Sequence, residues 1–175
     1  IAWIAATIDT RMNGFYTQER IGRYGSSFRV YKIRTMRIDL LIKTNVTTSN
    51  DLRITQLGSF FRILKIDELP QLFNIIKGEM SFVGPRPDVE GFADKLVGDD
   101  RILLSIRPGI TGPASLKYRN EEQLLAKVPD PESYNRDVIW PDKVLINKEY
   151  INNYRFSNDL KYILITLIGK NTSTI

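Results

Sequence analysis

The strongest helical pattern in the chain is interrupted by a proline. Apolar residues recur at helical spacing through residues 59–77, and Pro70 falls inside this run. Proline fits the first turn of a helix, but it disfavours helical backbone at the residue before it. The pattern therefore predicts two helices, one ending near Lys65 and one beginning around Asp67 or Glu68.

The other segments predict an α+β domain. Residues 15–36 carry aromatic and β-branched residues bounded by glycines, which predicts a β-hairpin with an irregular turn. Residues 160–168 are apolar on nearly every face, which is typical of a buried helix or of a helix lying in a membrane interface. Further helices are expected at 89–106, 121–127 and 142–154, a short strand or turn at 80–83, and loops at 39–51 and 129–141. The fold class is thus a compact, mainly helical α+β domain with one hairpin and interfacial helices.

Two missing residue types limit the chemistry. The 175 residues contain no cysteine and no histidine, so disulfides, thiolate metal sites and the commonest general base are excluded. Any catalysis must therefore use carboxylates, lysines, hydroxyls, arginines or a hard cation such as Mg²⁺. The net charge of +5 suits an anionic partner, although a solvated basic surface would give the same balance.

Adjacent carboxylates and fixed arginines are the candidate chemical groups. Asp67 and Glu68 lie at a predicted helix start, where negative charge is favoured, and Asp67 could simply cap that helix. Arg86 lies between two prolines, which would hold its guanidinium on a stiff backbone suited to bidentate phosphate recognition. Arg62 and Arg119 lie near these segments and extend the basic set.

The hairpin segment is also basic. Its cations alternate with aromatic residues, a pattern that occurs in nucleic-acid-binding surfaces. It carries no RNP, KH or helix-turn-helix signature, so we expect no nucleic-acid partner. The residues concerned are Arg20, Arg23, Arg29, Lys32, Arg34 and Arg37.

Five motifs in order resemble those of a known family. They occupy residues 18–22, 28–36, 67–72, 80–87 and 107–112. In this order they resemble the bacterial sugar transferases known as monotopic phosphoglycosyl transferases, and the resemblance runs from about residue 14 to residue 168. Members of that family transfer a sugar 1-phosphate from a UDP-sugar to a polyprenyl phosphate, usually undecaprenyl phosphate, and release UMP.

The resemblance implies a role for each candidate residue. Asp67 matches the nucleophile that forms a phosphosugar-aspartate intermediate, and Glu68 matches the Mg²⁺ ligand. Arg62 and Arg86 would hold phosphate, and Arg119 would help to bind the nucleotide diphosphate. Residues 113–120 differ from the sequence common in the family, so the match at Arg119 is the weakest.

The resemblance also implies an organisation and a location. Residues 1–13 would be the remnant of a membrane-associated re-entrant helix and a linker, 14–170 the catalytic domain and 171–175 a tail. The expected location is the cytoplasmic face of a bacterial inner membrane, with a UDP-sugar, a polyprenyl phosphate lipid and the membrane surface as partners, and with a homo-oligomer possible. The alternative is a non-catalytic polyprenyl-phosphate or membrane-surface adaptor, which would need the basic loops but not the carboxylate pair.

Overall fold

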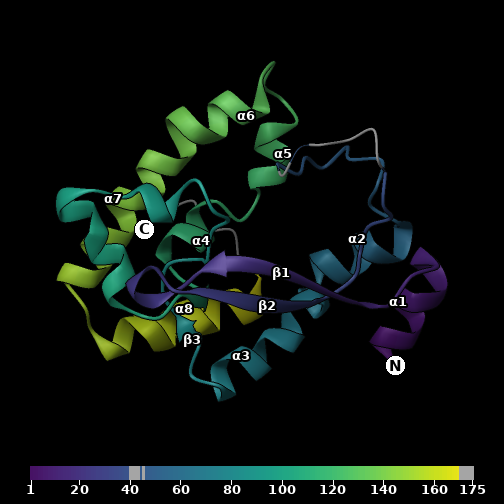
Figure 1. Ribbon diagram of the computed structural model, residues 1–175, viewed down its shortest axis with the longest axis horizontal. Coiled ribbons are helices and arrows are strands. Elements are labelled where there is room, and N and C mark those ends of the chain that lie inside the picture. The colour runs from purple at the N-terminus through teal and green to yellow at the C-terminus, as the bar shows by residue number, and fades with distance from the viewer. Residues whose placement is uncertain (40–43, 45, 170–175) are drawn as a thin grey trace.

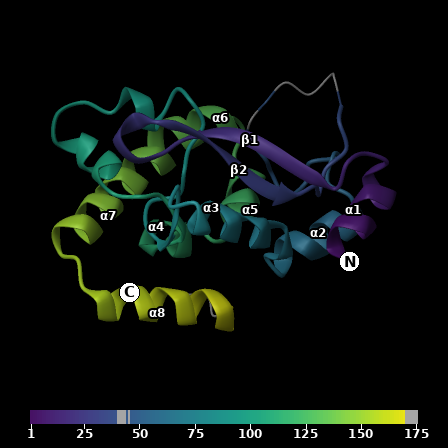
Figure 2. The ribbon, with the colours of Figure 1, turned by 60° about the horizontal axis from the view of Figure 1, so that its bottom comes forward.

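The computed structural model describes residues 1–39, 44 and 46–169, and it confirms a mainly helical α+β fold (Figure 1). An antiparallel hairpin crosses the molecule, with helices beneath it and at both ends (Figures 1 and 2). Part of the loop expected at 39–51, residues 40–43 and 45, lies outside the described residues. The α-helices are α1 (Ala2–Thr10), α2 (Gln56–Ile63), α3 (Leu72–Ile76), α4 (Pro113–Lys117), α5 (Glu121–Leu125), α6 (Pro131–Tyr134), α7 (Trp140–Asn152) and α8 (Phe156–Ile168).

The predicted hairpin is confirmed and carries one face of the site. Strands β1 (Phe15–Ile21) and β2 (Ser27–Ile33) pair antiparallel, and the short 3₁₀ helix η1 (Arg23–Gly25) makes the irregular turn. The side chain of Asn74 is fully buried and joins α3 to β2 through two hydrogen bonds. Its Oδ1 accepts a hydrogen bond from the backbone N–H of Tyr31 at 3.2 Å, and its Nδ2 donates to the backbone carbonyl of Arg29 at 2.7 Å.

The proline-interrupted run folds into three pieces instead of two. The first helix, α2, ends at Ile63 as expected, but residues 66–71 form the 3₁₀ helix η2 (Ile66–Gln71), and α-helical geometry resumes only after Pro70. Lys65 separates α2 from η2 with a left-handed backbone, φ 58°. This conformation is strained for a residue with a Cβ, and it turns the chain so that Asp67 and Glu68 face inward. A helix therefore begins within two residues of the predicted start at Asp67 or Glu68, but its first part is a 3₁₀ helix and the α-helix starts only at Leu72.

The motifs at residues 80–87 and 107–112 meet through a parallel strand pair. Strands β3 (Ser81–Val83) and β4 (Gly109–Thr111) lie side by side, with Ser81 opposite Gly109. Gly84 and Gly109 allow this approach, since a Cβ on Gly84 would lie 2.6 Å from the carbonyl oxygen of Arg107. The backbone N–H of Gly109 donates to the carbonyl of Pro85 at 2.8 Å. The two motifs therefore form one rigid unit that presents Arg86.

In the second half of the chain one prediction holds in part and one was wrong. Residues 89–106 are helical in part, as the 3₁₀ helices η3 (Ala93–Lys95) and η4 (Gly98–Ser105), because Gly91 and Gly98 take positive φ angles that break a continuous helical path. Residues 129–141 are helical rather than a loop, since α6 continues through the π-helix η5 (Asn135–Ile139) into α7. The wide turn of η5 precedes Pro141, whose ring could not fit an ordinary helix interior.

Helix α8 and its neighbours leave an apolar surface uncovered. Figure 2 shows α2 and α3 beneath the hairpin and α8 lowest on the same side. No side chain of α8 is fully buried, so a buried helix is excluded and the interfacial alternative stands. Within residues 1–39, 44 and 46–169, every helix is too short or too polar to traverse a bilayer. We call these exposed side chains the apolar underside: Phe60, Ile63, Leu64, Leu69, Leu72, Phe73, Ile76, Phe82, Leu160, Leu164, Leu167 and Ile168.

Candidate active site

The two adjacent carboxylates lie inside the fold. Asp67 and Glu68 each expose only 6% of their surface, because η2 packs against β2. Asp67 does not cap a helix, since the residue that precedes η2 is Lys65, and its Oδ1 is buried without a hydrogen-bond partner. Burial, followed by the negative charge of Glu68, raises the pKa of Asp67. An unpartnered buried carboxylate oxygen is costly, which makes Asp67 a candidate functional residue.

Arg86 joins the loop unit to the carboxylates. Its Nη2 donates a hydrogen bond to Glu68 Oε1 at 2.5 Å. Burial alone would raise the pKa of Glu68, but Arg86 and then Lys32 outweigh it and hold that pKa well below its usual range. The pKa of Arg86 is raised in turn, chiefly by the charge of Glu68. Glu68 is therefore ionised under all ordinary conditions, as a metal ligand must be.

Lys32 is a site residue that the sequence interpretation missed. Burial, with Arg86 next, lowers the pKa of Lys32 to about 8, while Glu68 and Asp67 oppose this shift. The signal was present in the strand, because alternate residues of β2 share a face and Lys32 falls in register with Phe28 and Val30. A lysine on an otherwise apolar strand face points to a buried charge partner.

Arg62 lies near the carboxylates but is occupied. Its positive charge partly opposes the rise in the pKa of Asp67 that burial causes. The Nη2 of Arg62, however, is bound to Glu122 of α5 in an ion pair. Its Nη1 also donates to Thr35 Oγ1 at 3.4 Å. The predicted phosphate-binding role therefore requires Glu122 to yield its place to an incoming phosphate.

Arg119 is not brought to the carboxylates by any contact in the described chain. Arg119 follows α4, and its side chain lies near Gly169 at the end of α8. A Cβ added to that glycine would lie 3.5 Å from the Nη2 of Arg119. Its Nη1 is buried and has no hydrogen-bond partner. An orphaned buried guanidinium nitrogen is suited to an anion, so the predicted nucleotide-binding role stays a prediction.

The donor set fits a magnesium ion held jointly with substrate. Across the described residues no group of three or more Asp, Glu, His or Cys side chains could form a protein-only metal cage. Magnesium commonly uses one or two carboxylates together with waters and substrate phosphates. Glu68, with the unpartnered Oδ1 of Asp67 beside it, matches that requirement.

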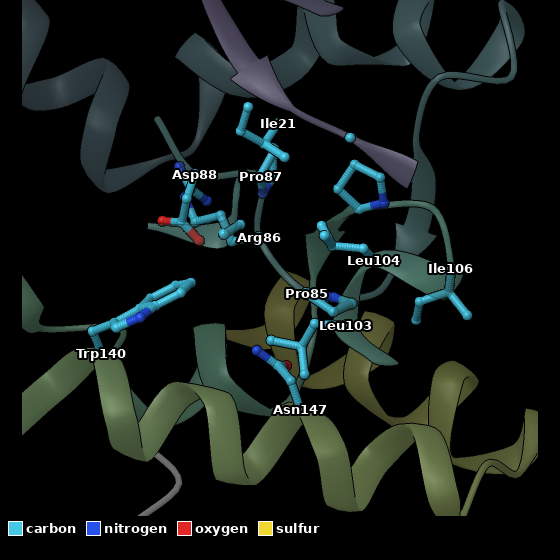
Figure 3. A pocket seen from close by; sticks show the side chains of 13 residues that line it. Ile21, Pro85, Arg86, Pro87, Asp88, Leu103, Leu104, Ile106, Trp140 and Asn147 are labelled. Atoms are coloured by element: carbon cyan, nitrogen blue, oxygen red, sulfur yellow. The ribbon is translucent and has the colours of Figure 1, made fainter. Parts of the chain in front are cut away.

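Arg86 also lines a small hollow. Figure 3 shows Trp140 and Asn147 projecting from α7 toward Arg86 and Asp88 across it. Burial raises the pKa of Asp88 to about 6, against the opposing charges of Lys143 and Arg20. Asn147 is 5% exposed, and its Oδ1 has no partner. Neither Asp88 nor Asn147 was singled out from the sequence, because a lone carboxylate and a lone amide carry no local pattern.

A buried carboxylate pair surrounded by cations is an arrangement suited to a phosphorylated ligand. Comparison with known proteins identifies the class of protein. The family model described as bacterial sugar transferase matches residues 1–171, and the chain therefore belongs to the bacterial sugar transferase family.

Named relatives agree with this assignment. The chain is 36% identical over 164 residues to the galactosyl transferase CpsE of Streptococcus agalactiae, an alignment covering 87% of this chain and 33% of that protein. It is 45% identical over 93 residues to a putative undecaprenyl-phosphate N-acetylgalactosaminyl 1-phosphate transferase of Bacillus subtilis, covering 53% and 52%. It is 32% identical over 167 residues to the undecaprenyl-phosphate galactose phosphotransferase of Salmonella typhimurium, covering 86% and 32%. The chain thus spans between a third and a half of the length of these relatives.

Proposed function

We propose that this chain transfers a sugar 1-phosphate from a UDP-sugar to undecaprenyl phosphate or a similar polyprenyl phosphate, through a covalent intermediate on Asp67. The observation that carries the proposal is the unpartnered, buried Oδ1 of Asp67 beside the Glu68–Arg86 pair. The names of the relatives from Bacillus subtilis and Salmonella typhimurium support the lipid acceptor and a galactose-type sugar.

The reaction proceeds in two displacements at one phosphorus. A carboxylate oxygen of Asp67 attacks the β-phosphorus of the donor, the bond from that phosphorus to the bridging oxygen breaks, and UMP leaves with that oxygen. A phosphate oxygen of the polyprenyl phosphate then attacks the same phosphorus. The bond to Asp67 breaks, the carboxylate is restored, and the product is a polyprenyl diphosphate sugar.

Charge neutralisation is the main task of the surrounding residues. A carboxylate attacks an anionic phosphate slowly because like charges repel, so Arg86, Lys32 and Arg62 must screen the phosphate oxygens. Glu68 would hold Mg²⁺, and a bound ion would supply further positive charge to the phosphate groups. Burial keeps these interactions strong, since little water competes with them.

The apolar underside supplies the contact with the membrane. Leu69, which is 58% exposed, directly follows Glu68, so the uncovered apolar surface begins one residue from the carboxylates. This many large apolar side chains exposed on neighbouring elements is unusual for a surface that faces only water. We place it against the lipid headgroups, where a polyprenyl phosphate can present its phosphate to Asp67 while its chain stays in the bilayer.

Trapping the intermediate tests the proposal. The protein is incubated with Mg²⁺ and UDP-galactose or UDP-N-acetylgalactosamine labelled in the sugar, then quenched in acid and separated by electrophoresis. Label should remain on the wild-type chain and be at least about 1000-fold lower in Asp67→Asn, which keeps the shape and removes the anionic nucleophile. Matched melting curves show that the variant is folded.

Two results would count against the enzyme. No retained label and no UMP release with any UDP-sugar, while polyprenyl phosphate still binds, would favour the non-catalytic adaptor instead. Equal labelling of wild type and Asp67→Asn would place the covalent step on another residue.

A further inference from the structure

The loop of residues 84–88 is held at both of its ends by other parts of the chain. At its start, the N–H of Gly84 donates to the carbonyl of Thr111 at 2.9 Å. At its end, the carbonyl of Asp88 accepts from the N–H of Ile21, the last residue of β1, at 2.9 Å. The arginine in the middle of this loop is therefore carried on a backbone that is fixed on both sides.

Arg20 adds a third contact to this loop, and this one comes from a side chain. Its Nη1 donates to the carbonyl of Pro87 at 3.2 Å, and its Nη2 donates to Gln18 Oε1 at 2.8 Å. Proline has no N–H, so its carbonyl is the backbone group through which Pro87 can be held. Pro87 directly follows Arg86, so a shift of this carbonyl would move Arg86 as well. A substitution at Arg20 removes this contact and leaves the backbone contacts in place.

The loop buries its prolines and leaves its arginine accessible. Pro85 and Pro87 are buried, whereas 41% of the Arg86 side chain is exposed. The Arg86 guanidinium can therefore meet an incoming phosphate while it donates to Glu68. Arg20 thus contacts the loop through its backbone, while Arg86 presents the accessible charge.

The charge of Arg20 also influences which carboxylate Arg86 can bind. Burial raises the pKa of Asp88, and the charge of Arg20 opposes this rise more strongly than the charge of Arg86 does. Burial lowers the pKa of Arg20, and the charge of Arg86 lowers it further, so the two guanidiniums repel each other. With Arg20 present, Arg86 would therefore meet a like charge on turning from Glu68 toward Asp88.

We propose that Arg20 is a positioning residue that keeps the guanidinium of Arg86 on Glu68. It does so by holding the carbonyl of Pro87 and by repelling Arg86 from Asp88, and it makes no contact with the donor. A charged group that is already in place when the phosphate arrives stabilises the transition state without a further cost of ordering. The inference rests on the proposed function for the part that Arg86 plays in the reaction.

The first measurement needs no substrate. NMR of protein with isotope-labelled arginine follows the Arg86 guanidinium, whose signals are identified by their loss in Arg86→Met. The bond to Glu68 slows the rotation of this guanidinium in wild type. Arg20→Met should speed that rotation about tenfold, because the loop contact and the opposing charge no longer hold Arg86 on Glu68. Matched melting curves show that the variant is folded.

Two further variants serve as controls. Arg29→Met removes the same charge from the hairpin, but the Arg29 side chain is 70% exposed and its Nε lies 3.9 Å from Glu19 Oε1, so the Arg86 signals should not change. Arg20→Lys keeps the charge and a donor, and it should restore the rotation to within about threefold of wild type. Should Arg20→Met fail to fold, Arg20→Gln, which is polar but uncharged, replaces it in every comparison.

The second measurement is the labelling of Asp67 by the sugar-labelled donor. Arg20→Met should lower the maximal labelling rate about tenfold and change the donor concentration at half that rate by less than about twofold, because a misplaced Arg86 fails mainly in the transition state. In the Arg86→Met background the same substitution should have no further effect, since Arg20 acts through Arg86.

Several results would overturn the inference. Unchanged rotation of Arg86 in folded Arg20→Met would do so, and so would a failure of Arg20→Lys to recover either measurement. A loss of labelling on Arg20→Met that persists in full when Arg86 is already replaced would make Arg20 a direct contact of the donor instead.

The two measurements separate this inference from the proposed function. Faster Arg86 rotation in Arg20→Met, without labelling of any variant, keeps the positioning contact and removes the transferase reaction. Labelling of wild type, with rotation and rate unchanged in Arg20→Met, keeps the covalent step and removes the positioning role.

Discussion

The site and the apolar underside reverse the usual distribution of polarity. Asp67 and Glu68 are buried, whereas Ile76 exposes 81% and Leu167 77% of their surfaces. Burying charge costs free energy unless it is paired, and exposing apolar area forfeits the stabilisation that its burial would give. Under the proposed function both costs have a use, because a charged ligand would bind within and an apolar phase would lie below.

Removing Arg86 should have the largest effect on the buried side of this comparison. Arg86→Met should slow covalent labelling of Asp67 by about 100- to 1000-fold, because the phosphate loses its nearest fixed cation. It should also lower the free energy of unfolding by about 1–3 kcal/mol, because Glu68 is left buried and unpaired. Labelling kinetics and urea denaturation measure the two effects.

A second substitution separates these effects. Arg86→Met combined with Glu68→Gln should recover most of the stability but none of the activity. The folded-state pKa of Glu68 is depressed, so its pair stabilises the protein above the usual carboxyl pKa and is lost as pH falls toward the folded value. The stability difference between wild type and Arg86→Met should therefore shrink in acid. A difference that grows in acid would contradict this account.

Lys32 should set an alkaline limit on activity. Its pKa is lowered to about 8, so it carries its charge below that pH and loses it above. The apparent kcat/KM for labelling should fall as pH rises through about 8, because the free protein then lacks one of its screening cations. Lys32→Arg should move the fall above pH 10, since arginine stays charged. An unchanged alkaline limb in that variant would remove Lys32 from the explanation.

Glu122 should have a smaller effect, of opposite sign. Glu122→Gln frees Arg62 from its ion pair, so the KM for the UDP-sugar should fall about threefold while kcat changes little. Initial-rate kinetics at several donor concentrations would show the change. The matched variant Glu121→Gln breaks the pair with Lys143 instead and should leave KM unaltered. A rise in KM for Glu122→Gln would mean that the pair positions Arg62 rather than competes for it.

Substitutions on the apolar underside should have almost no effect on the reaction with the nucleotide donor. Ile76→Glu should change the free energy of unfolding by less than about 0.5 kcal/mol, because that side chain is exposed, and should leave donor-dependent labelling unchanged. Binding to vesicles containing anionic lipid should weaken about tenfold, since apolar burial is lost and negative charge is added. Co-sedimentation measures the binding, with Glu149→Gln as a control on the exposed part of α7. Unaltered vesicle binding would place the membrane contact elsewhere.

Local patterns predicted the elements that depend on local signals. The hairpin, α2, β3 and α5 follow from periodicity and from glycine or proline boundaries, and the structure confirms them. Residues 129–141 were expected to be a loop because three prolines occur there, yet Asp130 accepts a hydrogen bond from the N–H of Ser133 at 3.0 Å and starts α6. The π-helix η5 then carries the helical path past Pro141. A local cap, Asp130, that the sequence contains was therefore overlooked.

The candidate site was predictable only where its residues belong to motifs. Asp67, Glu68 and Arg86 come from motif segments, and the structure brings them together. The pairing of Arg62 with Glu122 could not be foreseen, because it joins segments that are far apart in the chain. Asp88 and Asn147 became visible only as acceptors without donors, a property that requires coordinates.

The close approach of Gly84 to Arg107 and Gly109 holds both ends of residues 85–108 at the strand pair, so the sequence between these ends can change without moving the pair. The chain leaves the β3–β4 unit at Pro85 and returns to it at Pro108, so both ends of this excursion are anchored at one place. Changes in its outermost turns would alter the walls of the hollow that Leu103 and Leu104 line, without displacing the Arg86 guanidinium that pairs with Glu68. The sequence of this excursion can therefore vary while that ion pair stays in place.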